Sequence, residues 1–282
     1  MKKKTILSIL LGFTIMLAQN QQDIIQFGDY FYGSGLSFDV REARDQALEE
    51  LTEQIAVCVA KSYEQKIQES KKQLNEDVKS ILKTHSSATL KNVKTIKEPQ
   101  DDGRINVFCY LSKQEVVKIF NERKQLIYDI YQKAKQNESA GNYAAALKLY
   151  YFSILLMNSL PEQNVVFQGI NFTTDIPEKI NQIIANVRFT PVNDKKISGS
   201  EREITLQITH NGAPVSMLDF TFWDGSNQVF VQGRDGLATF QLFGASAGFD
   251  NLKLNIKYAY YDARDEYNII ADLWDVVNKP TF

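Results

Sequence analysis

Few residues in this chain have the types and spacing that chemistry needs. The two histidines, His85 and His210, lie far apart in the sequence, so no metal-ligand or acid–base spacing links them. No phosphate-binding loop, nucleophile elbow or zinc-protease motif occurs, and the Gly-Ser-Gly at 33–35 lacks the further glycine of a dinucleotide-binding loop. The sequence therefore predicts a protein that is not an enzyme and that uses no metal or other cofactor.

The first 19 residues have the pattern of a secretory signal peptide. Three lysines at positions 2–4 precede an apolar run from Ile6 to Ala18, which is too short to span a bilayer. No cysteine lies near the expected cleavage point, so a lipoprotein signal is not predicted. Loss of the three lysines changes the formal charge from −2 to −5, which disfavours binding to nucleic acid. We expect an exported mature chain without a transmembrane segment.

Residues 20–112 combine a glycine-punctuated strand with a long amphipathic helix. Gly33 and Gly35 interrupt the aromatic strand YFYGSGLSFD, which suits the close passage of another backbone. Asp39 stands at the N-cap position with Glu42 three residues later, as in a capping box. The helix that follows has a mostly apolar stripe at three- and four-residue steps, made of Ala43, Ala47, Leu51, Ile55, Cys58, Ser62 and Tyr63. A hairpin after this helix completes a predicted α+β domain with a small antiparallel sheet.

The strand and helix together resemble a known family. An aromatic–Gly–x–Gly strand followed by EARDQALEELTEQIAVCVAKSYE is similar to the amino-terminal domain of the LPP-twenty lipoproteins and of the flagellar assembly protein T. The similarity covers roughly residues 24–120 and consists of small and apolar positions rather than catalytic ones. The resemblance implies a protein that assembles with, or scaffolds, other components of a bacterial cell envelope.

Cys58 and Cys109 are the only cysteines, and export would bring them into oxidising conditions. Cys58 shares the apolar stripe of the long helix with Leu51, and Cys109 shares a strand face with Val107 and Leu111. Both thiols should therefore point into the layer between helix and sheet. We predict a Cys58–Cys109 disulfide. The alternative is two separate buried thiols that act as small apolar residues.

Residues 113–185 are predicted to be helical. A second long helix runs from Lys113 to about Ser139, and the next segment, SAGNYAAALKLYYFSILLMNSLP, is similar to the second helix of a tetratricopeptide repeat. In that resemblance Gly141 allows the tight turn between the helices. Ala146 lets the two helices approach, and Tyr150 fills the gap between them.

The helical region contains only one such repeat-like unit. Because about three repeats are needed for a stable solenoid, the sequence predicts a helical hairpin that leans on its neighbours. A third helix is expected over residues 176–185, with Pro177 in its first turn.

Residues 186–282 change in composition to short strands and turns. Asn211-Gly212, Asp224-Gly225 and Asp235-Gly236 are turn signals between alternating strands. The segment ITHNGAPVSMLDFTFWDGSNQVFVQGRDGLATFQL is similar to bacterial Ig-like and carboxypeptidase regulatory-like modules. The region therefore predicts a β-sandwich. Residues 263–278 are expected to form a C-terminal helix, or alternatively a last strand.

Aromatic residues of this last domain are the candidate contact residues. Alternation along Leu218–Trp223 places three apolar side chains inward and Trp223 outward, beside a turn. In the alternative arrangement, Trp223 caps the end of the sandwich core. Tyr258 and Tyr260 form a second aromatic group. An exposed tryptophan with nearby tyrosines could contact a protein partner or a glycan.

Taken together, these patterns predict an exported, non-enzymatic protein of a bacterial cell envelope, in the periplasm or associated with the outer membrane. The first hypothesis is a scaffold or assembly module whose partners are other envelope proteins. The alternative is an accessory protein that binds carbohydrate or cell wall through the C-terminal sandwich. A secreted hydrolase is disfavoured, because no nucleophile–base set is visible.

Overall fold

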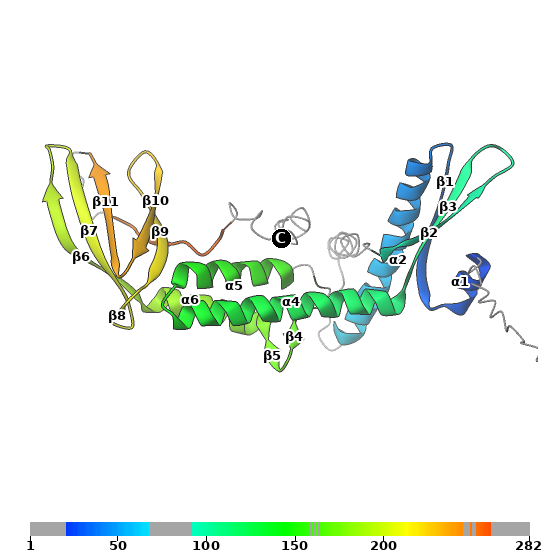
Figure 1. The fold of residues 1–282 in the computed structure, drawn as a ribbon, viewed down its shortest axis with the longest axis horizontal. Helices are drawn as coiled ribbons and strands as arrows, with labels where there is room; N and C mark the ends of the chain where they lie inside the picture. Colours follow the sequence, from blue (N-terminus) through cyan, green and yellow to red (C-terminus); the bar gives the residue numbers. More distant parts are fainter. Residues whose placement is uncertain are drawn as a thin grey trace, which may run out of the picture. The chain divides into compact units, whose positions relative to one another are not determined.

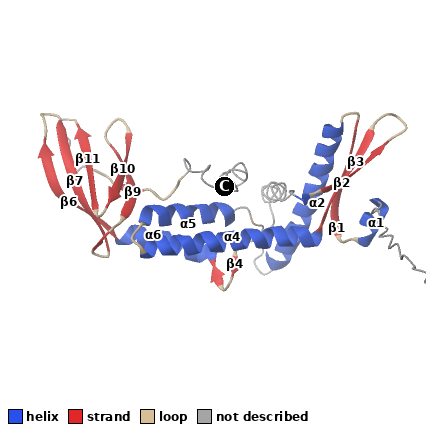
Figure 2. Ribbon diagram, in the orientation of Figure 1, coloured by secondary structure: helices blue, strands red, loops and turns tan. Residues whose placement is uncertain are grey.

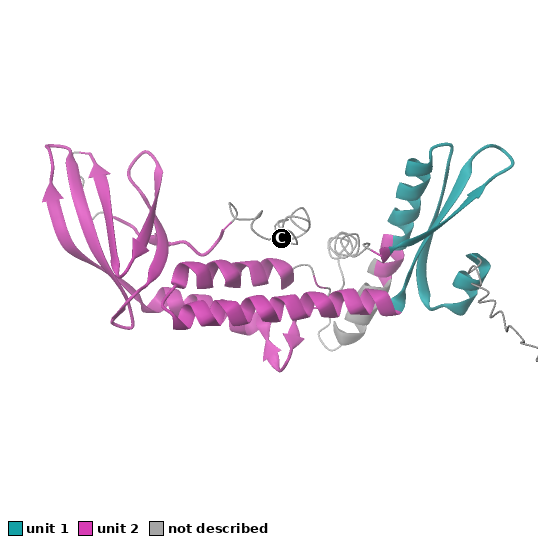
Figure 3. Cartoon of the chain, viewed as in Figure 1, with its two compact units in different colours: residues 1–51, 93–113 teal, residues 52–92, 114–282 magenta. Residues whose placement is uncertain are grey.

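The computed structural model describes residues 21–67, 92–157, 160, 162, 164–244, 249 and 252–260. The predicted signal peptide, His85 and the predicted helix or strand at 263–278 lie outside the described residues. The chain forms two compact units (Figure 3): the first comprises residues 1–51 and 93–113, and the second residues 52–92 and 114–282. The helical region and the C-terminal sheet belong to the same unit.

The first unit is built on a three-stranded antiparallel sheet (Figure 1). Its strands, in the order in which they pair, are β1 (Tyr30–Ser37), β3 (Ile105–Ser112) and β2 (Lys94–Pro99). Two helices accompany the sheet, α1 (Gln21–Phe27) and α2 (Val40–Ile67). Helix α1 was not predicted from the sequence.

The two glycines of β1 let α2 lie directly on the sheet, as the sequence predicted. A Cβ atom on Gly33 would collide with the carbonyl oxygen of Ala47, and one on Gly35 would collide with that of Ala43. Ala43, Ala47 and Leu51 are fully buried, so the small residues at the start of the stripe do allow the close approach.

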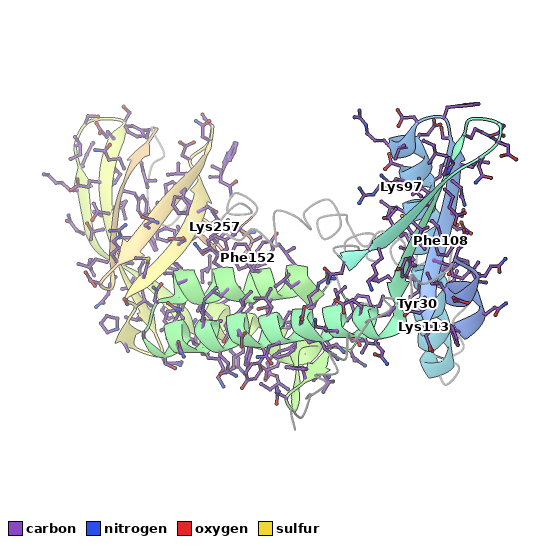
Figure 4. All side chains as sticks on the ribbon, turned by 45° about the vertical axis from the view of Figure 1, so that its right-hand side comes forward. Tyr30, Lys97, Phe108, Lys113, Phe152 and Lys257 are labelled. Carbon is purple, nitrogen blue, oxygen red and sulfur yellow. The ribbon has the colours of Figure 1, made fainter. Side chains whose placement is uncertain are left out.

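The opposite face of this sheet is aromatic. Tyr30, Tyr32, Phe108 and Tyr110 lie on it, and Ile24 of α1 packs against this group with its side chain fully buried. The Tyr32 and Phe108 rings are stacked with centroids 5.6 Å apart, and Phe108 is labelled in Figure 4. Aromatic residues therefore form a covered layer in the first unit.

Side chains of α2 also occupy the open edge of β1. The Ser34 N–H donates a hydrogen bond to Oε2 of Glu50 at 2.6 Å, and the Leu36 N–H donates to Oε1 of Gln46 at 3.1 Å. Such bonds satisfy backbone donors that an edge strand would otherwise offer to another strand.

The start of α2 follows the capping prediction in part. Oδ1 of Asp39 accepts hydrogen bonds from the N–H groups of Arg41, at 2.7 Å, and Glu42, at 3.4 Å, as an N-cap residue should. The Glu42 carboxylate does not accept a hydrogen bond from the Asp39 N–H, as it would in a complete capping box. It accepts a hydrogen bond from the Ser37 hydroxyl at 2.6 Å, so this residue ties the end of β1 to the helix.

Three further helices lie in the second unit, after the part of α2 that belongs to it (Figure 2). They are α4 (Lys113–Ser139), α5 (Tyr143–Met157) and α6 (Phe172–Asn186). A short hairpin of β4 (Val166–Phe167) and β5 (Ile170–Asn171) precedes α6, in a segment without predicted structure. Helices α4 and α5 form the expected helical hairpin, with Gly141 at a φ of 71° in the turn. Ala146 and Tyr150 are fully buried, as the repeat resemblance implied.

The third helix starts earlier than predicted. Helix α6 begins at Phe172, so Pro177 lies inside the helix and not in its first turn. Phe172 is fully buried, and its ring lies edge-on to Tyr131 of α4, with centroids 5.4 Å apart. Packing of the Phe172 ring favours a helix that starts before the predicted residue 176. This tertiary contact outweighs the local preference of Pro177 for the first turn of a helix.

The C-terminal sheet contains seven described antiparallel strands, six on one pairing path and a short seventh that branches from it. They are β6 (Val187–Lys196), β7 (Glu201–His210), β8 (Ala213–Pro214), β9 (Met217–Trp223), β10 (Gln228–Arg234), β11 (Leu237–Phe243) and β12 (Asn255–Ile256). The pairing order is β12-β9-β10-β11-β7-β6, and β8 pairs with β7. The α+β class, the helical hairpin and the antiparallel C-terminal sheet are thus confirmed.

This sheet is curled, so its two halves enclose a core. Strands β10 and β11 pair only at Arg234 and Leu237, beside their hairpin turn, and diverge from there. The Phe240 ring of one half lies 4.8 Å from the Phe222 ring and 6.1 Å from the Phe220 ring of the other, between centroids. The predicted sandwich core is present, but one curled sheet surrounds it instead of two separate sheets.

Candidate functional site

Polar side chains gather where the helices of the second unit meet its sheet. Tyr143 is the first residue of α5 and His210 the last of β7, and the Tyr143 hydroxyl lies 2.8 Å from Nδ1 of His210. Their rings are 4.4 Å apart between centroids. Burial lowers the pKa of His210, and the nearby Glu138 carboxylate opposes that shift. The histidine therefore joins sheet to helix.

Two tyrosines tie the helices to each other through carboxylates. The Tyr131 hydroxyl of α4 donates to Oδ2 of Asp175 in α6, and the Tyr150 hydroxyl of α5 donates to Oε2 of Glu138 in α4 at 2.7 Å. Burial and these carboxylates raise the pKa of both tyrosines. Lys179 lies 3.8 Å from the other Glu138 oxygen. These ionisable groups bind one helix to the next.

Tyr260 is a buried structural residue, which corrects its prediction as a contact residue. It is only 4% exposed. Its hydroxyl lies 3.1 Å from the Ala144 carbonyl oxygen of α5 and 3.5 Å from Oδ2 of Asp219 in β9. Sequence alternation could not reveal this, because it depends on the chain leaving the sheet after β12 and crossing to α5.

Asp219 is a buried carboxylate beside this contact. Its side chain is 7% exposed. Burial raises its pKa, and the neighbouring Lys257 and Gln232 oppose the shift. The ammonium of Lys257, a residue labelled in Figure 4, lies 4.8 Å from the Tyr260 ring centroid and 5.0 Å from that of Phe230. The buried Asp219 carboxylate, Lys257 and two aromatic rings thus lie between α5 and the outer side of the sheet.

Beyond this border the outer side of the sheet is open and aromatic. Trp223 is 63% exposed and Phe230 is 48% exposed. Trp223 pairs with Gln228, and Thr221 pairs with Phe230, so the two rings are diagonal neighbours on one face. Asn255 of β12 pairs with Thr221 on the other side. We call these five residues the outer aromatic surface: Trp223, Phe230, Thr221, Gln228 and Asn255.

Only one of the predicted contact residues belongs to this surface. Trp223 faces outward, as alternation predicted, and it does not cap the core. Tyr258 is 51% exposed but lies elsewhere. The Lys257 N–H donates to the Asp219 carbonyl oxygen at 2.9 Å, which places Tyr258 about five residues, or ~16 Å, along β9 from Trp223. The structure therefore groups Trp223 with Phe230 and not with the tyrosines.

Phe230 was missed by reasoning from the sequence, although a signal for it exists. The turn between β9 and β10 spans residues 224–227, and its length fixes the pairing of Thr221 with Phe230. Asp224 shapes this turn, because its Oδ1 accepts hydrogen bonds from the N–H groups of Ser226 and Asn227, both at 2.7 Å. Alternation back from Val231 would then have placed Phe230 outward beside Trp223.

The predicted disulfide remains a prediction. Cys109 is buried and is not bonded to another cysteine in the described structure, and its Sγ lies 3.7 Å from Oγ1 of Thr95. Burial raises the pKa of the thiol. Cys109 pairs with Gly33, so it lies on the sheet face that α2 covers, as expected. The side chain of Cys58 lies outside the described residues.

Within the described ranges, no three His, Cys, Asp or Glu side chains converge to hold a metal ion. No helix in the described part of the chain is long and apolar enough to cross a bilayer. No protein-family model matches the chain, and neither do any curated proteins or solved structures. The family and module resemblances therefore remain predictions.

Proposed function

We propose that this chain is an exported, non-enzymatic protein of a bacterial cell envelope that scaffolds other envelope proteins. The signal-peptide pattern supports export, and the resemblance to envelope-assembly domains supports the class. One structural observation carries the proposal, namely the joint that fixes the C-terminal sheet to the helices of the second unit.

The joint consists of contacts that come from different parts of the chain. The Ser216 N–H donates to the Gly141 carbonyl oxygen at 2.9 Å, and the Asn211 N–H donates to that of Asn186 at 3.2 Å. Two side-chain contacts, Tyr143 with His210 and Tyr260 with Ala144, reinforce them. Contacts from α5, from the end of α6 and from the turn between α4 and α5 thus hold the sheet in one orientation.

A fixed orientation is what a scaffold needs. When two partners bind one rigid body, neither has to order it first, and this lowers the entropic cost of assembly. The buried ionisable groups described above bind one element of this body to another, which favours a load-bearing role over a reactive one.

The test is crosslinking of the exported chain in the cells that produce it. We expect a discrete adduct between the chain and at least one envelope protein. A Tyr143→Ala variant, which loosens the joint, should still be exported but should form much less of that adduct. Phe243→Ala, which removes an exposed ring at the end of the sheet away from the joint, is the control and should crosslink normally. A chain that stays at its own mass after crosslinking would contradict the proposal.

A further inference from the structure

The outer aromatic surface has a composition that the scaffold role does not use. Its two rings are exposed, and its other three members carry a hydroxyl or a carboxamide. None of the five side chains is ionisable. Exposed aromatic rings cost free energy in water unless a partner covers them, and the neutral polar groups beside them restrict what that partner can be.

We propose that this surface binds an uncharged polysaccharide chain. A sugar ring has an apolar C–H face that can lie on an aromatic ring and hydroxyl groups at its rim that need hydrogen-bond partners. Trp223 and Phe230 supply the flat faces. Gln228 and Asn255, both exposed, supply carboxamides that donate and accept hydrogen bonds.

Two contacts within or beside this surface hold part of it in place before a ligand arrives. The Gln228 side chain donates from Nε2 to Oγ1 of Thr221 at 3.1 Å, which fixes the direction of its amide on this face. The Phe230 ring has the Lys257 ammonium 5.0 Å from its centroid. A rigid aromatic surface loses little conformational entropy on binding.

The geometry favours a chain of sugars over a single one. Diagonal neighbours on adjacent antiparallel strands are about 7–8 Å apart, so Trp223 and Phe230 can cover two different sugar rings of one chain. An acidic polypeptide is the competing occupant, because Lys257 borders the surface. The neutral composition of the five residues favours the glycan over it.

The experiment is affinity electrophoresis of the whole mature chain in gels that contain one polymer each. The neutral probes are laminarin, mannan, dextran and glycol chitin, and the anionic probes are alginate and polyglutamate. We expect slower migration with at least one neutral polysaccharide and none with alginate or polyglutamate. Trp223→Ala and Phe230→Ala should each weaken that binding about tenfold or more, as loss of a central aromatic contact does.

The matched control is Phe243→Ala. Phe243 is 58% exposed on β11 of the same sheet but lies outside the surface, so its loss should leave binding unchanged. Melting temperatures of all three variants should stay close to that of the parent. The proposal is overturned if no neutral polysaccharide slows the chain, if polyglutamate does so instead, or if Phe243→Ala weakens binding as much as Trp223→Ala. The scaffold proposal has a separate readout, because protein adducts do not depend on retention by polysaccharide.

Discussion

The two sheets of this protein use aromatic residues in opposite ways. In the first unit, Tyr30, Tyr32, Phe108 and Tyr110 line one face, and Ile24 of α1 packs on them. In the second unit, Trp223 and Phe230 line an outer face on which they stay exposed. In both sheets the side chains alternate between the two faces along each strand. What decides between core and surface is whether another element covers the face.

The sheets are also attached to their helices in different ways. Helix α2 packs closely on the first sheet, because two glycines of β1 have no side chain that would hold the helix away. Helix α5 is joined to the second sheet by polar contacts at Tyr143 and Tyr260. The first attachment should be sensitive to added volume, and the second to lost hydrogen bonds and to pH.

The largest effect is expected from truncating the inner side of β9. Phe222→Ala removes a fully buried ring that contacts Phe240 across the curled sheet, so the free energy of unfolding should fall by about 3–5 kcal/mol. Trp223→Ala, one residue along the same strand, should change it by less than about 0.5 kcal/mol. Urea unfolding of both variants measures the contrast. Equal losses would show that Trp223 is a core residue after all.

The next effect concerns volume at the first sheet. Gly33→Ala puts a methyl group against the α2 backbone, and the helix must move away, which should cost about 1–3 kcal/mol. Gly199→Ala is the matched control, because no atom lies within 4 Å of a Cβ built there. Thermal unfolding of both variants checks this. A Gly33→Ala protein as stable as the control would mean that α2 does not lie on β1.

A smaller effect should follow loss of a hydrogen bond at the second attachment. Tyr260→Phe removes the hydroxyl beside the Ala144 carbonyl and the buried Asp219, at a cost of about 1–2 kcal/mol. Tyr258→Phe removes the same group from an exposed ring and should cost almost nothing. Denaturant midpoints of the pair give the comparison, and it fails if the two substitutions cost the same.

The smallest effect is the pH dependence of the His210 contact. Burial lowers the pKa of His210 in the folded chain, so folding favours the neutral ring. The contribution of His210 to the free energy of unfolding is complete above the pKa of an unfolded histidine, about 6.5. It is lost as the pH falls through that value toward the lower pKa of the folded chain. Between about pH 8 and pH 5, the parent should lose more stability than a His210→Gln variant. Parallel losses in both proteins would remove His210 as the cause.

Much of this fold could be predicted where a local pattern decided the outcome. Gly33, Asp39 and the outward Trp223 followed from close-packing glycines, capping chemistry and strand alternation, which act over a few residues. The early start of α6 and the burial of Tyr260 could not be predicted in this way, because each depends on a contact with a residue distant in the sequence, Tyr131 and Ala144 respectively.

The candidate surface was half predictable for the same reason. Trp223 follows from its own strand, whereas Phe230 requires the pairing between two strands and Asn255 the pairing of a third. The aromatic face of the first sheet gives the converse case. Its burial depends in part on α1, a short helix whose seven residues, QQDIIQF, carry no strong helical signal of their own.

The most direct test of the contrast between the two sheets is hydroxyl-radical footprinting of the mature protein, read residue by residue by mass spectrometry. Trp223 and Phe230 should be oxidised rapidly, at rates comparable to the exposed control Phe243, whereas Phe108 and Tyr110 should be strongly protected. Protection of Trp223 and Phe230 equal to that of Phe108 would contradict the account, because the outer aromatic surface would then be covered in the free protein.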